Sequence, residues 1–208
     1  RITWNEDGSG VILQVYSEDN KDRWIASVDL GAHSLVPQHH LRDAAWIGWG
    51  FSDMGWLADG RRFYYLSEED GFSHLYVKAI DEAEPRRLTW GAYEVSDVRL
   101  SRDKTTVYYT ANASHPGIYE AWRLDPATGK AVQLTSLGGR NDWTLSPDEK
   151  HLLISHSTTT RPPELYVKPI DPPGAAKQIT WTVSDRFASK PWVEPQIVEV
   201  PSSEAGRP

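Results

Sequence analysis

The stretch from residue 56 to residue 90, WLADGRRFYYLSEEDGFSHLYVKAIDEAEPRRLTW, decides the fold of this chain. It contains two long runs, Arg62–Ser67 (RFYYLS) and His74–Ile80 (HLYVKAI), whose aromatic and branched side chains fit a pleated, half-buried surface. The turn between them ends at Gly71, which can take a positive φ at no steric cost. Short runs before and after add two more strands. The stretch therefore predicts a four-stranded antiparallel meander of about 40 residues, the size of one propeller blade.

This meander recurs along the chain. An aspartate marks the first turn of each unit, and the four aspartates are separated by 52, 44 and 45 residues: Asp7, Asp59, Asp103 and Asp148. HLYVKAID at 74–81 matches ELYVKPID at 164–171, and RRLTW at 86–90 resembles KQITW at 177–181. Repeats of this length with four strands each are typical of propeller blades. The alternative of a two-sheet sandwich gives no reason for such a period, so we predict an all-β propeller fold with four blades.

The predicted blades span residues 1–44, 45–92, 93–141 and 142–181 approximately. In the second blade we place the first strand at Ala45–Gly48, followed by a loop or bulge at Trp49–Asp53. In the fourth we expect a hairpin loop that ends at Pro162-Pro163. Tryptophans that recur at similar blade positions are expected to lie in the core between blades: Trp4, Trp24, Trp56, Trp90, Trp122, Trp143 and Trp181.

Composition limits the class of protein. The chain has 208 residues, a net charge of −7, no cysteine and ten tryptophans. The acidic balance argues against non-specific nucleic-acid binding, because no basic stripe is present to neutralise phosphates. Without cysteine there are no disulfides and no thiolate metal sites, but this does not identify the compartment, for which a bacterial periplasm and a cytoplasm both fit. No stretch approaches the roughly 20 apolar residues that a membrane span needs.

Both ends look like internal positions of a longer protein. The chain opens directly on a strand-like run, without an initiator methionine or a signal segment. After Trp181 the repeat stops, and residues 182–195 are rich in loop residues. Gln196–Val200 then reads as a lone strand. We therefore expect residues 182–208 to be an exit segment that leads into another domain.

Three stretches resemble one family: RFYYLSEEDGFSHLYV at 62–77, AWIGWGFSDMGWLADG at 45–60 and PQIVEVPS at 195–202. They resemble the propeller of the prolyl oligopeptidase (S9) family of serine peptidases, and most closely its dipeptidyl peptidase IV branch. The resemblance implies an eight-bladed propeller over an α/β-hydrolase domain, of which this chain would be the second half, and an exit strand towards that domain. It implies a parent enzyme that releases N-terminal dipeptides, often X-Pro.

The same resemblance points to substrate-contact candidates. In the family, the segment that enters this blade presents an aromatic residue and an arginine to the substrate cavity. Here that segment reads Trp49-Gly50-Phe51, so the resemblance implies an aromatic contact from Trp49 or Phe51 and no charged contact. The family's paired glutamates, which hold the substrate's amine, would precede Arg1, whereas Glu68-Glu69 lie in a turn of a blade. The G-x-S-x-G nucleophile elbow is absent, so the chain carries no catalytic residue and should be inactive alone.

The remaining polar pairs favour structural roles. His39 and His40 are adjacent on a strand, so their side chains point to opposite faces and cannot share one ion. No H-E-x-x-H spacing is present, and we expect no metal and no cofactor. Ser73-His74 and Ser155-His156 are sequence neighbours, which is the wrong geometry for a nucleophile and its base.

Two classes of function follow. The chain is either the non-catalytic propeller portion of a serine exopeptidase, which gates peptide access to the hydrolase domain, or a protein-binding propeller scaffold with no catalytic partner domain. In the first case its partners are a peptide substrate, the missing half of the propeller and the hydrolase domain. Four blades cut from eight would expose two apolar blade faces. We therefore expect the isolated chain to close into a tighter ring or to pair with a second copy.

Overall fold

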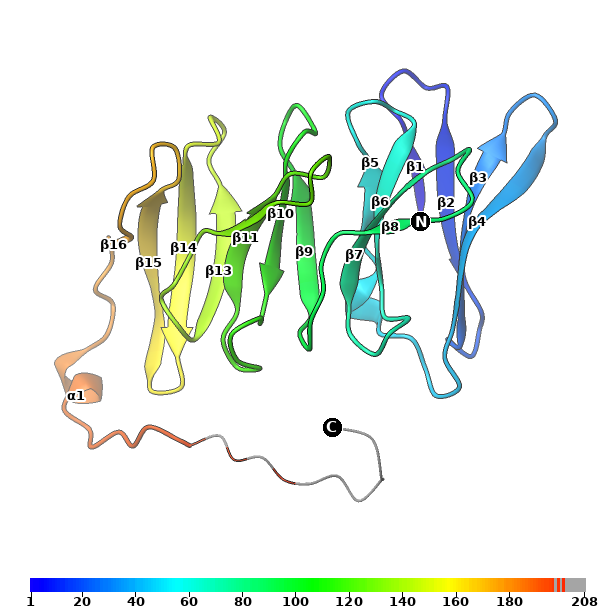
Figure 1. Cartoon of the computed structure of the whole chain (residues 1–208). Helices are drawn as coiled ribbons and strands as arrows, with labels where there is room; N and C mark the ends of the chain where they lie inside the picture. The colour runs from blue at the N-terminus through cyan, green and yellow to red at the C-terminus, as the bar shows by residue number, and fades with distance from the viewer. Residues whose placement is uncertain (197, 199, 201–208) are drawn as a thin grey trace. The chain divides into compact units, whose positions relative to one another are not determined.

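The computed structural model describes residues 1–196, 198 and 200. In this part of the chain the strands form four antiparallel four-stranded sheets, each in simple chain order (Figure 1). The first sheet contains β1 (Ile2–Trp4), β2 (Val11–Tyr16), β3 (Asp22–Asp29) and β4 (Ser34–Arg42). The second contains β5 (Met54–Trp56), β6 (Arg62–Ser67), β7 (His74–Ala79) and β8 (Arg86–Arg87). The third contains β9 (Val95–Leu100), β10 (Val107–Ala111), β11 (Glu120–Leu124) and β12 (Ala131–Gln133). The fourth contains β13 (Arg140–Leu145), β14 (His151–Thr158), β15 (Arg161–Pro169) and β16 (Lys177–Gln178). The all-β prediction with four repeated meanders is confirmed.

The chain forms two compact units, Arg1–Asn141 and Asp142–Pro208. Within the first unit, the second sheet lies between the first and the third (Figure 1). One core joins side chains of the first two sheets: Ile12, Ile25, Met54, Trp56, Phe63, Tyr65 and Tyr76. The other core includes Leu57, Tyr64, Leu66, Leu75 and Val77 of the second sheet and Val95, Val98, Val107, Tyr109 and Leu124 of the third. Both faces of the second sheet are therefore buried, which is why the opening stretch is so rich in large apolar side chains.

The four first-turn aspartates make the same local structure. Each accepts a hydrogen bond on Oδ1 from the backbone N–H two residues ahead, at 2.9 to 3.2 Å: Asp7 from Ser9, Asp59 from Arg61, Asp103 from Thr105 and Asp148 from Lys150. The intervening residue has positive φ in every case: Gly8, Gly60, Lys104 and Glu149. This bond is the local pairing that aspartate side chains make in turns. It explains why the period of the sequence is visible at these positions.

The similar sequences at the ends of the repeats, such as RRLTW and KQITW, have a structural cause. In the last three sheets a threonine after the fourth strand accepts from the backbone N–H of the third strand, at 2.8 to 3.0 Å: Thr89 from Leu75, Thr135 from Ala121 and Thr180 from Leu165. The hydroxyl continues the ladder where the fourth strand stops pairing. The similarity between RRLTW and KQITW therefore reflects a structural bond that closes each sheet.

We expect the turn aspartates to make stability fall in acid. Hydrogen bonds from nearby serine hydroxyls, followed by backbone N–H groups, lower the pKa of Asp7, Asp103 and Asp148 below the ordinary 3.8. Because the folded-state pKa is the lower one, the stabilisation is present above 3.8 and disappears as pH falls through the folded-state pKa. A triple Asp→Asn variant at these positions keeps an acceptor oxygen and should lose less stability between about pH 4 and pH 2. Urea unfolding across this range measures the difference, and parallel losses in both proteins would contradict it.

Several strand boundaries differ from the prediction. Ala45–Gly48 is not a strand, because the second sheet begins at Met54–Trp56 and residues 43–53 form a linker. The sequence predicts the fourth strand of the first sheet only over Ser34–Gln38, whereas β4 runs on to Arg42, since its second half pairs with β3 as far as Asp22. The loop expected to end at Pro162-Pro163 is wrong, because β15 already begins at Arg161. Pro162 and Pro163 do not prevent the strand from starting there, because they are its second and third residues and their missing N–H groups fall at the hairpin end of the sheet.

The expectation for the repeated tryptophans is only partly right. Trp56 and Trp143 are buried, and Trp122 packs partly buried against the core of the first unit. The others are exposed to 39–76%: Trp4, Trp24, Trp90 and Trp181. Trp90 and Trp181 each follow a closing threonine, where the chain has already left the sheet. Trp24 stacks on the cross-strand neighbour His40, with ring centroids 5.2 Å apart.

The outer face of the first sheet is apolar and exposed. Ile2, Trp4, Val15 and Trp24 are all at least 39% exposed, and the strand registers place them on the face opposite Ile12 and Ile25. Such a face is expected for a blade that would have another neighbour. Pairing of the isolated chain with a second copy stays a prediction.

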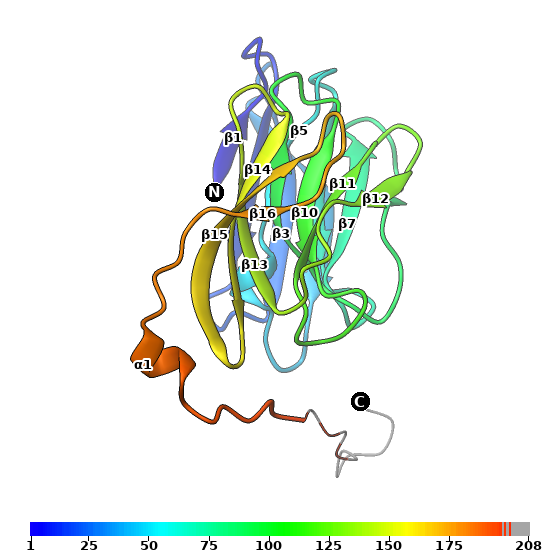
Figure 2. The ribbon, with the colours of Figure 1, turned by 90° about the vertical axis from the view of Figure 1, so that its left-hand side faces the viewer.

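The second unit ends in an exit segment. A short helix, α1 (Asp185–Ala188), follows the fourth sheet and lies beyond the β14–β15 hairpin (Figure 2). The predicted strand Gln196–Val200 falls partly outside the described residues, since 197 and 199 are not among them, and Gln196, Val198 and Val200 are not in a strand. None of the helices in the described part of the chain is long and apolar enough to cross a membrane.

Candidate functional site

The candidate site lies on the linker between the first and second sheets. Residues Trp49–Phe51 form a single 3-10 turn, η1, just before β5. The start of the linker is held by Asp43, whose Oδ1 accepts from the backbone N–H of Ala45 at 2.7 Å. Further on, the Ile47 N–H donates to the Asn20 carbonyl at 2.9 Å, and Asn20 Nδ2 donates back to the Ile47 carbonyl at 2.7 Å. The linker is therefore fastened to the β2–β3 turn rather than loose.

The two predicted contact residues occupy different environments on this turn. The Trp49 indole is 67% exposed and stacks on the ring of Tyr16, with centroids 5.5 Å apart and planes 7° from parallel. Phe51 is partly buried and packs against the core between the second and third sheets. The structure thus makes Trp49 the side chain available to a ligand and Phe51 the anchor that fixes the turn.

A buried arginine supports the turn from below. Arg23 on β3 is 1% exposed, and its Nη1 donates to the Phe51 carbonyl at 3.1 Å. Its Nε and Nη2 make no hydrogen bond among the described residues. Burial lowers the pKa of Arg23, while nearby Tyr16, Tyr65 and Glu68 act in the opposite direction. Arginine is seldom fully buried unless its charge is paired. The buried Arg23 guanidinium, which bonds to the Phe51 carbonyl, therefore points to a role in shaping this turn.

Glu68 supports the turn from the second sheet. Its Oε2 accepts from the Gly48 N–H at 2.8 Å, immediately before the turn. Burial raises the pKa of this carboxyl above its usual value, against the Gly48 hydrogen bond and the nearby Arg23 charge. Gly48 has no room for a side chain, because a Cβ there would lie 2.9 Å from Glu68 Oε2 and from Phe51 Cδ2. A glycine at position 48 is therefore required for this close approach.

Sequence reasoning missed these supporting residues. The sequence predicts a strand at Arg23–Leu30 and gives Arg23 no further role, although a single arginine in the apolar run RWIASV is a signal that points to one. Glu68 and Glu69 do lie in the turn after β6, as predicted. Glu69 Oε2 is 2.8 Å from His39 Nε2, and this contact lowers the pKa of Glu69.

Asp53 ties the end of the linker to the third sheet. Its Oδ2 accepts from the Val98 N–H at 2.9 Å, and Arg1 Nη1 lies 3.7 Å from its Oδ1. Burial raises the pKa of Asp53, against the Val98 hydrogen bond and the Arg1 charge. The linker is therefore held by all three sheets of the first unit.

A cavity of about 430 Å³ lies between the start of the linker and the turn after β6. Its walls include Trp46, Ile47, Glu68 and Glu69, and the Trp46 indole is 70% exposed. An exposed indole and accessible carboxylates can contact apolar and basic parts of a peptide. They do not make a nucleophile with its base.

The serine–histidine pairs are not arranged as a nucleophile and its base, as the sequence predicts. Ser73 Oγ donates to the Val95 carbonyl at 2.7 Å. His74 lies with Nδ1 2.9 Å from Thr89 Oγ1 and Nε2 3.0 Å from the Gly91 carbonyl, and it is fully buried. In the fourth sheet Ser155 and His156 are successive residues of β14, so their side chains leave opposite faces. The arrangement of Ser73 and His74 confirms a structural role for that pair.

The two adjacent histidines of β4 point to opposite faces, which confirms that prediction. His39 packs on the Tyr65 ring at 4.7 Å, whereas His40 stacks on Trp24 and lies 2.8 Å from Asp22 Oδ1. Among residues 1–196, 198 and 200, no three His, Asp or Glu side chains gather in a group that could hold a metal ion.

Repeated four-stranded meanders with cores between successive sheets define part of a β-propeller. Residues 1–163 match the family model described as the dipeptidyl peptidase IV (DPP IV) N-terminal region. The chain belongs to this family.

Solved structures show the same fold. Porphyromonas gingivalis dipeptidyl peptidase 4 matches with a TM-score of 0.68 and 20% identity, over 83% of this chain and 24% of that chain. A Bacteroides ovatus structure described by the name dipeptidyl aminopeptidase IV matches with a TM-score of 0.69 and 17% identity, over 86% and 28% of the two chains. TolB from Acinetobacter baumannii matches with a TM-score of 0.56 and 20% identity, over 88% and 44%. This chain thus spans less than half the length of each.

Proposed function

We propose that this chain is the non-catalytic propeller portion of a serine exopeptidase resembling dipeptidyl peptidase IV. In this role it controls peptide access to a hydrolase domain that is not in this sequence. The observation that carries the proposal is the family match over residues 1–163, which includes the linker and its aromatic turn. In the proposed enzyme, peptide substrate, further blades and the hydrolase domain are the partners of this chain.

The proposed task of the aromatic turn is to contact the peptide. Trp49 presents a rigid indole, preorganised by the Tyr16 ring beneath it. A rigid aromatic surface binds with little loss of side-chain entropy, which favours affinity. Phe51 then acts by positioning Trp49 and not by touching substrate.

The alternative is a propeller scaffold that binds proteins without a catalytic domain. A propeller fold by itself does not distinguish the two, because one fold can carry different functions. The gene sequence downstream of the codon for Pro208 distinguishes the peptidase from the scaffold. A G-x-S-x-G elbow downstream supports the peptidase, and an uninterrupted downstream sequence without one rejects it.

The activity of the whole protein provides the quantitative test. With glycyl-prolyl-p-nitroanilide as substrate, Trp49→Ala should raise KM about 2- to 12-fold, which corresponds to an aromatic contact of about 0.5–1.5 kcal/mol, with kcat little changed. Leu30→Ala is the matched control. Leu30 is 45% exposed and follows β3 at the opposite end of the first sheet. An unchanged KM for Trp49→Ala would remove Trp49 from the substrate site, and no cleavage by the wild-type protein would remove the peptidase proposal.

A further inference from the structure

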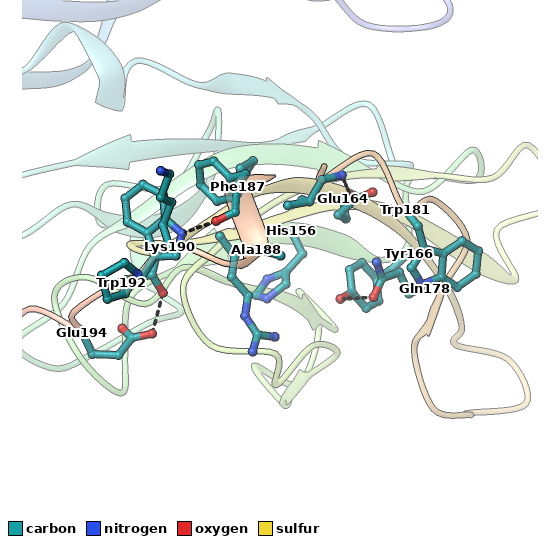
Figure 3. Close-up of a pocket in the computed structure, with 15 residues that line it drawn as sticks. His156, Glu164, Tyr166, Gln178, Trp181, Phe187, Ala188, Lys190, Trp192 and Glu194 are labelled. Atoms are coloured by element: carbon teal, nitrogen blue, oxygen red, sulfur yellow. Dashed lines mark hydrogen bonds between the residues drawn. The ribbon is translucent and has the colours of Figure 1, made fainter. Parts of the chain in front are cut away.

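The second unit contains a separate cavity that has no part in the proposal above. It has a volume of about 610 Å³ and lies between the fourth sheet and the exit segment (Figure 3). His156, Tyr166 and Gln178 line it from the sheet, while Phe187 and Trp192 line it from the exit segment. This volume is in the range of sites for small organic ligands.

The near end of the exit segment is fixed to the sheet by one carboxylate. Glu164 Oε1 accepts from the Thr182 N–H at 2.6 Å, from the Thr182 hydroxyl at 2.9 Å and from the Val183 N–H at 3.2 Å. Its Oε2 accepts from the Thr180 hydroxyl. The oxygens of Glu164 are therefore engaged by the chain itself.

The far end is fixed by a second carboxylate. Glu194 accepts from the hydroxyls of Thr159 and Thr160, at the tip of the β14–β15 hairpin, at 3.1 and 2.6 Å. Between the two fixed ends the Phe187 and Trp192 rings pack at 4.4 Å, and Trp192 Nε1 donates to the Phe187 carbonyl at 2.9 Å (Figure 3). The exit segment thus forms a strap over the cavity, held at both ends and stiffened in the middle.

Four aromatic side chains form part of the cavity wall, and several of its polar atoms already make hydrogen bonds within the chain. Tyr166, Trp181, Phe187 and Trp192 line it. The Tyr166 hydroxyl donates to Gln178 Oε1 at 3.0 Å, and both carboxylates are engaged as described above. These groups are therefore partly engaged before any ligand binds.

Two cationic side chains also line the cavity. Lys190 lines the cavity, and its ammonium group makes no hydrogen bond or ion pair within the described residues. Arg161 also lines the cavity, where its charge acts on Glu194. An ammonium ligand would meet two like charges, and it would have to compete with the hydrogen bonds that Glu164 and Glu194 already accept. A carboxylate or sulfonate would meet the three donors of Lys190, which no described residue engages.

We propose that this cavity binds a small apolar anion, namely an aromatic or aliphatic carboxylate or sulfonate. Its apolar part packs against the aromatic walls and its acid group pairs with Lys190. Aromatic walls supply most of the affinity in such a site, and one charged group fixes the orientation. The proposal is independent of the peptidase role, because none of its residues belongs to the linker of the first unit.

The test uses two fluorescent probes that differ mainly in charge, with the 208-residue chain. 8-Anilinonaphthalene-1-sulfonate is an apolar anion, and N-phenyl-1-naphthylamine is a neutral relative. Lys190→Gln should weaken binding of the sulfonate about 3- to 5-fold and leave the neutral probe within 2-fold, as expected for one exposed ion pair. Trp192→Ala should weaken both probes at least 5-fold by removing an aromatic wall. Lys130→Gln, an exposed lysine in the β11–β12 turn, is the matched control and should change neither.

The outcomes separate the proposal from binding elsewhere. Exposed apolar surface on the first sheet also attracts such probes, so only the component lost in Trp192→Ala is assigned to the cavity. Unchanged affinity of both probes in Trp192→Ala would overturn the site. Equal effects of Lys190→Gln and Lys130→Gln on the sulfonate would overturn the assignment of an anion. Melting temperatures within about 2 °C of the wild type would show that the variants remain folded.

Discussion

Phe63→Ala should cost about 3–5 kcal/mol of the free energy of unfolding, the range for truncating a fully buried aromatic side chain. Phe63 is 0% exposed and belongs to the core between the first and second sheets. Its ring meets Trp56 edge-on at 6.1 Å and stacks beside Tyr65 at 5.7 Å. Truncation removes these contacts and leaves a cavity between two sheets that cannot approach freely, because each is held by its own ladder.

Urea unfolding followed by circular dichroism measures this loss. Phe63→Leu is the conservative control and should cost less than about 1.5 kcal/mol, because it keeps most of the volume. Trp90→Ala removes an aromatic side chain just after the same sheet that is 61% exposed, and it should stay within about 0.5 kcal/mol of the wild type. A Phe63→Ala variant as stable as Trp90→Ala would mean that the core between the first and second sheets does not hold the first unit together.

The repeat of the chain was readable because its signals are local. The aspartate of each first turn bonds to a backbone N–H two residues ahead, so the pattern needs nothing beyond the turn itself. The closing threonine is similar, since it bonds within its own sheet. Local bonds of this kind give the number of sheets and their order along the chain. The division of the whole protein into domains stays a prediction.

Burial was harder to predict because it depends on neighbouring sheets. Trp4 and Trp56 occupy the same position in the first strand of successive sheets. Trp56 is 3% exposed because the first sheet covers it, and its Nε1 donates to the Thr3 carbonyl at 3.1 Å. Trp4 stays 56% exposed. The sequence pattern is the same at both positions, so only the arrangement of sheets separates them.

The candidate site shows the same division between local and non-local information. The sequence places Trp49–Phe51 in a loop or bulge, because these residues do not fit the strand pattern of the repeat. The residues that hold the turn come from β3 and from the turn after β6, which are 28 and 20 positions from their bonding partners in the linker. No spacing rule relates these positions, because each contact depends on how two sheets pack. The role of Trp49 as a substrate contact stays a proposal.

Arg23→Ala should be nearly as costly as a core truncation and should also disturb the aromatic turn. It removes a fully buried side chain and the donor to the Phe51 carbonyl, so we expect a loss of about 2–4 kcal/mol. Arg23→Met keeps most of the volume and removes a buried charge that costs desolvation energy. Its expected loss is therefore below about 1.5 kcal/mol. Arg186→Met, on the exposed α1, is the control for removing a positive charge and should be neutral within about 0.5 kcal/mol.

A spectroscopic measurement distinguishes support of the turn from simple packing. In chain labelled with 5-fluorotryptophan, the ¹⁹F resonance of Trp49 can be assigned by its loss in Trp49→Phe. Both Arg23 variants should shift or broaden this resonance, since both lack the bond to Phe51, while the resonance of Trp143 in the second unit should not move. An unchanged Trp49 signal in Arg23→Met would show that the arginine fills space without holding the turn.

The pH dependence of Arg23→Met provides a second check, because Glu68 feels the arginine charge. Burial already raises the pKa of Glu68, and Arg23 acts to lower it, so its removal should raise that pKa further. A folded-state pKa above the unfolded value of 4.5 stabilises the protein in acid and loses that contribution as pH rises through the folded-state pKa. The stability difference between Arg23→Met and wild type should therefore be largest at neutral pH and shrink towards about pH 4. In the double variant with Glu68→Gln the difference should no longer depend on pH over this range. If that dependence persisted without Glu68, another group would have to sense the arginine.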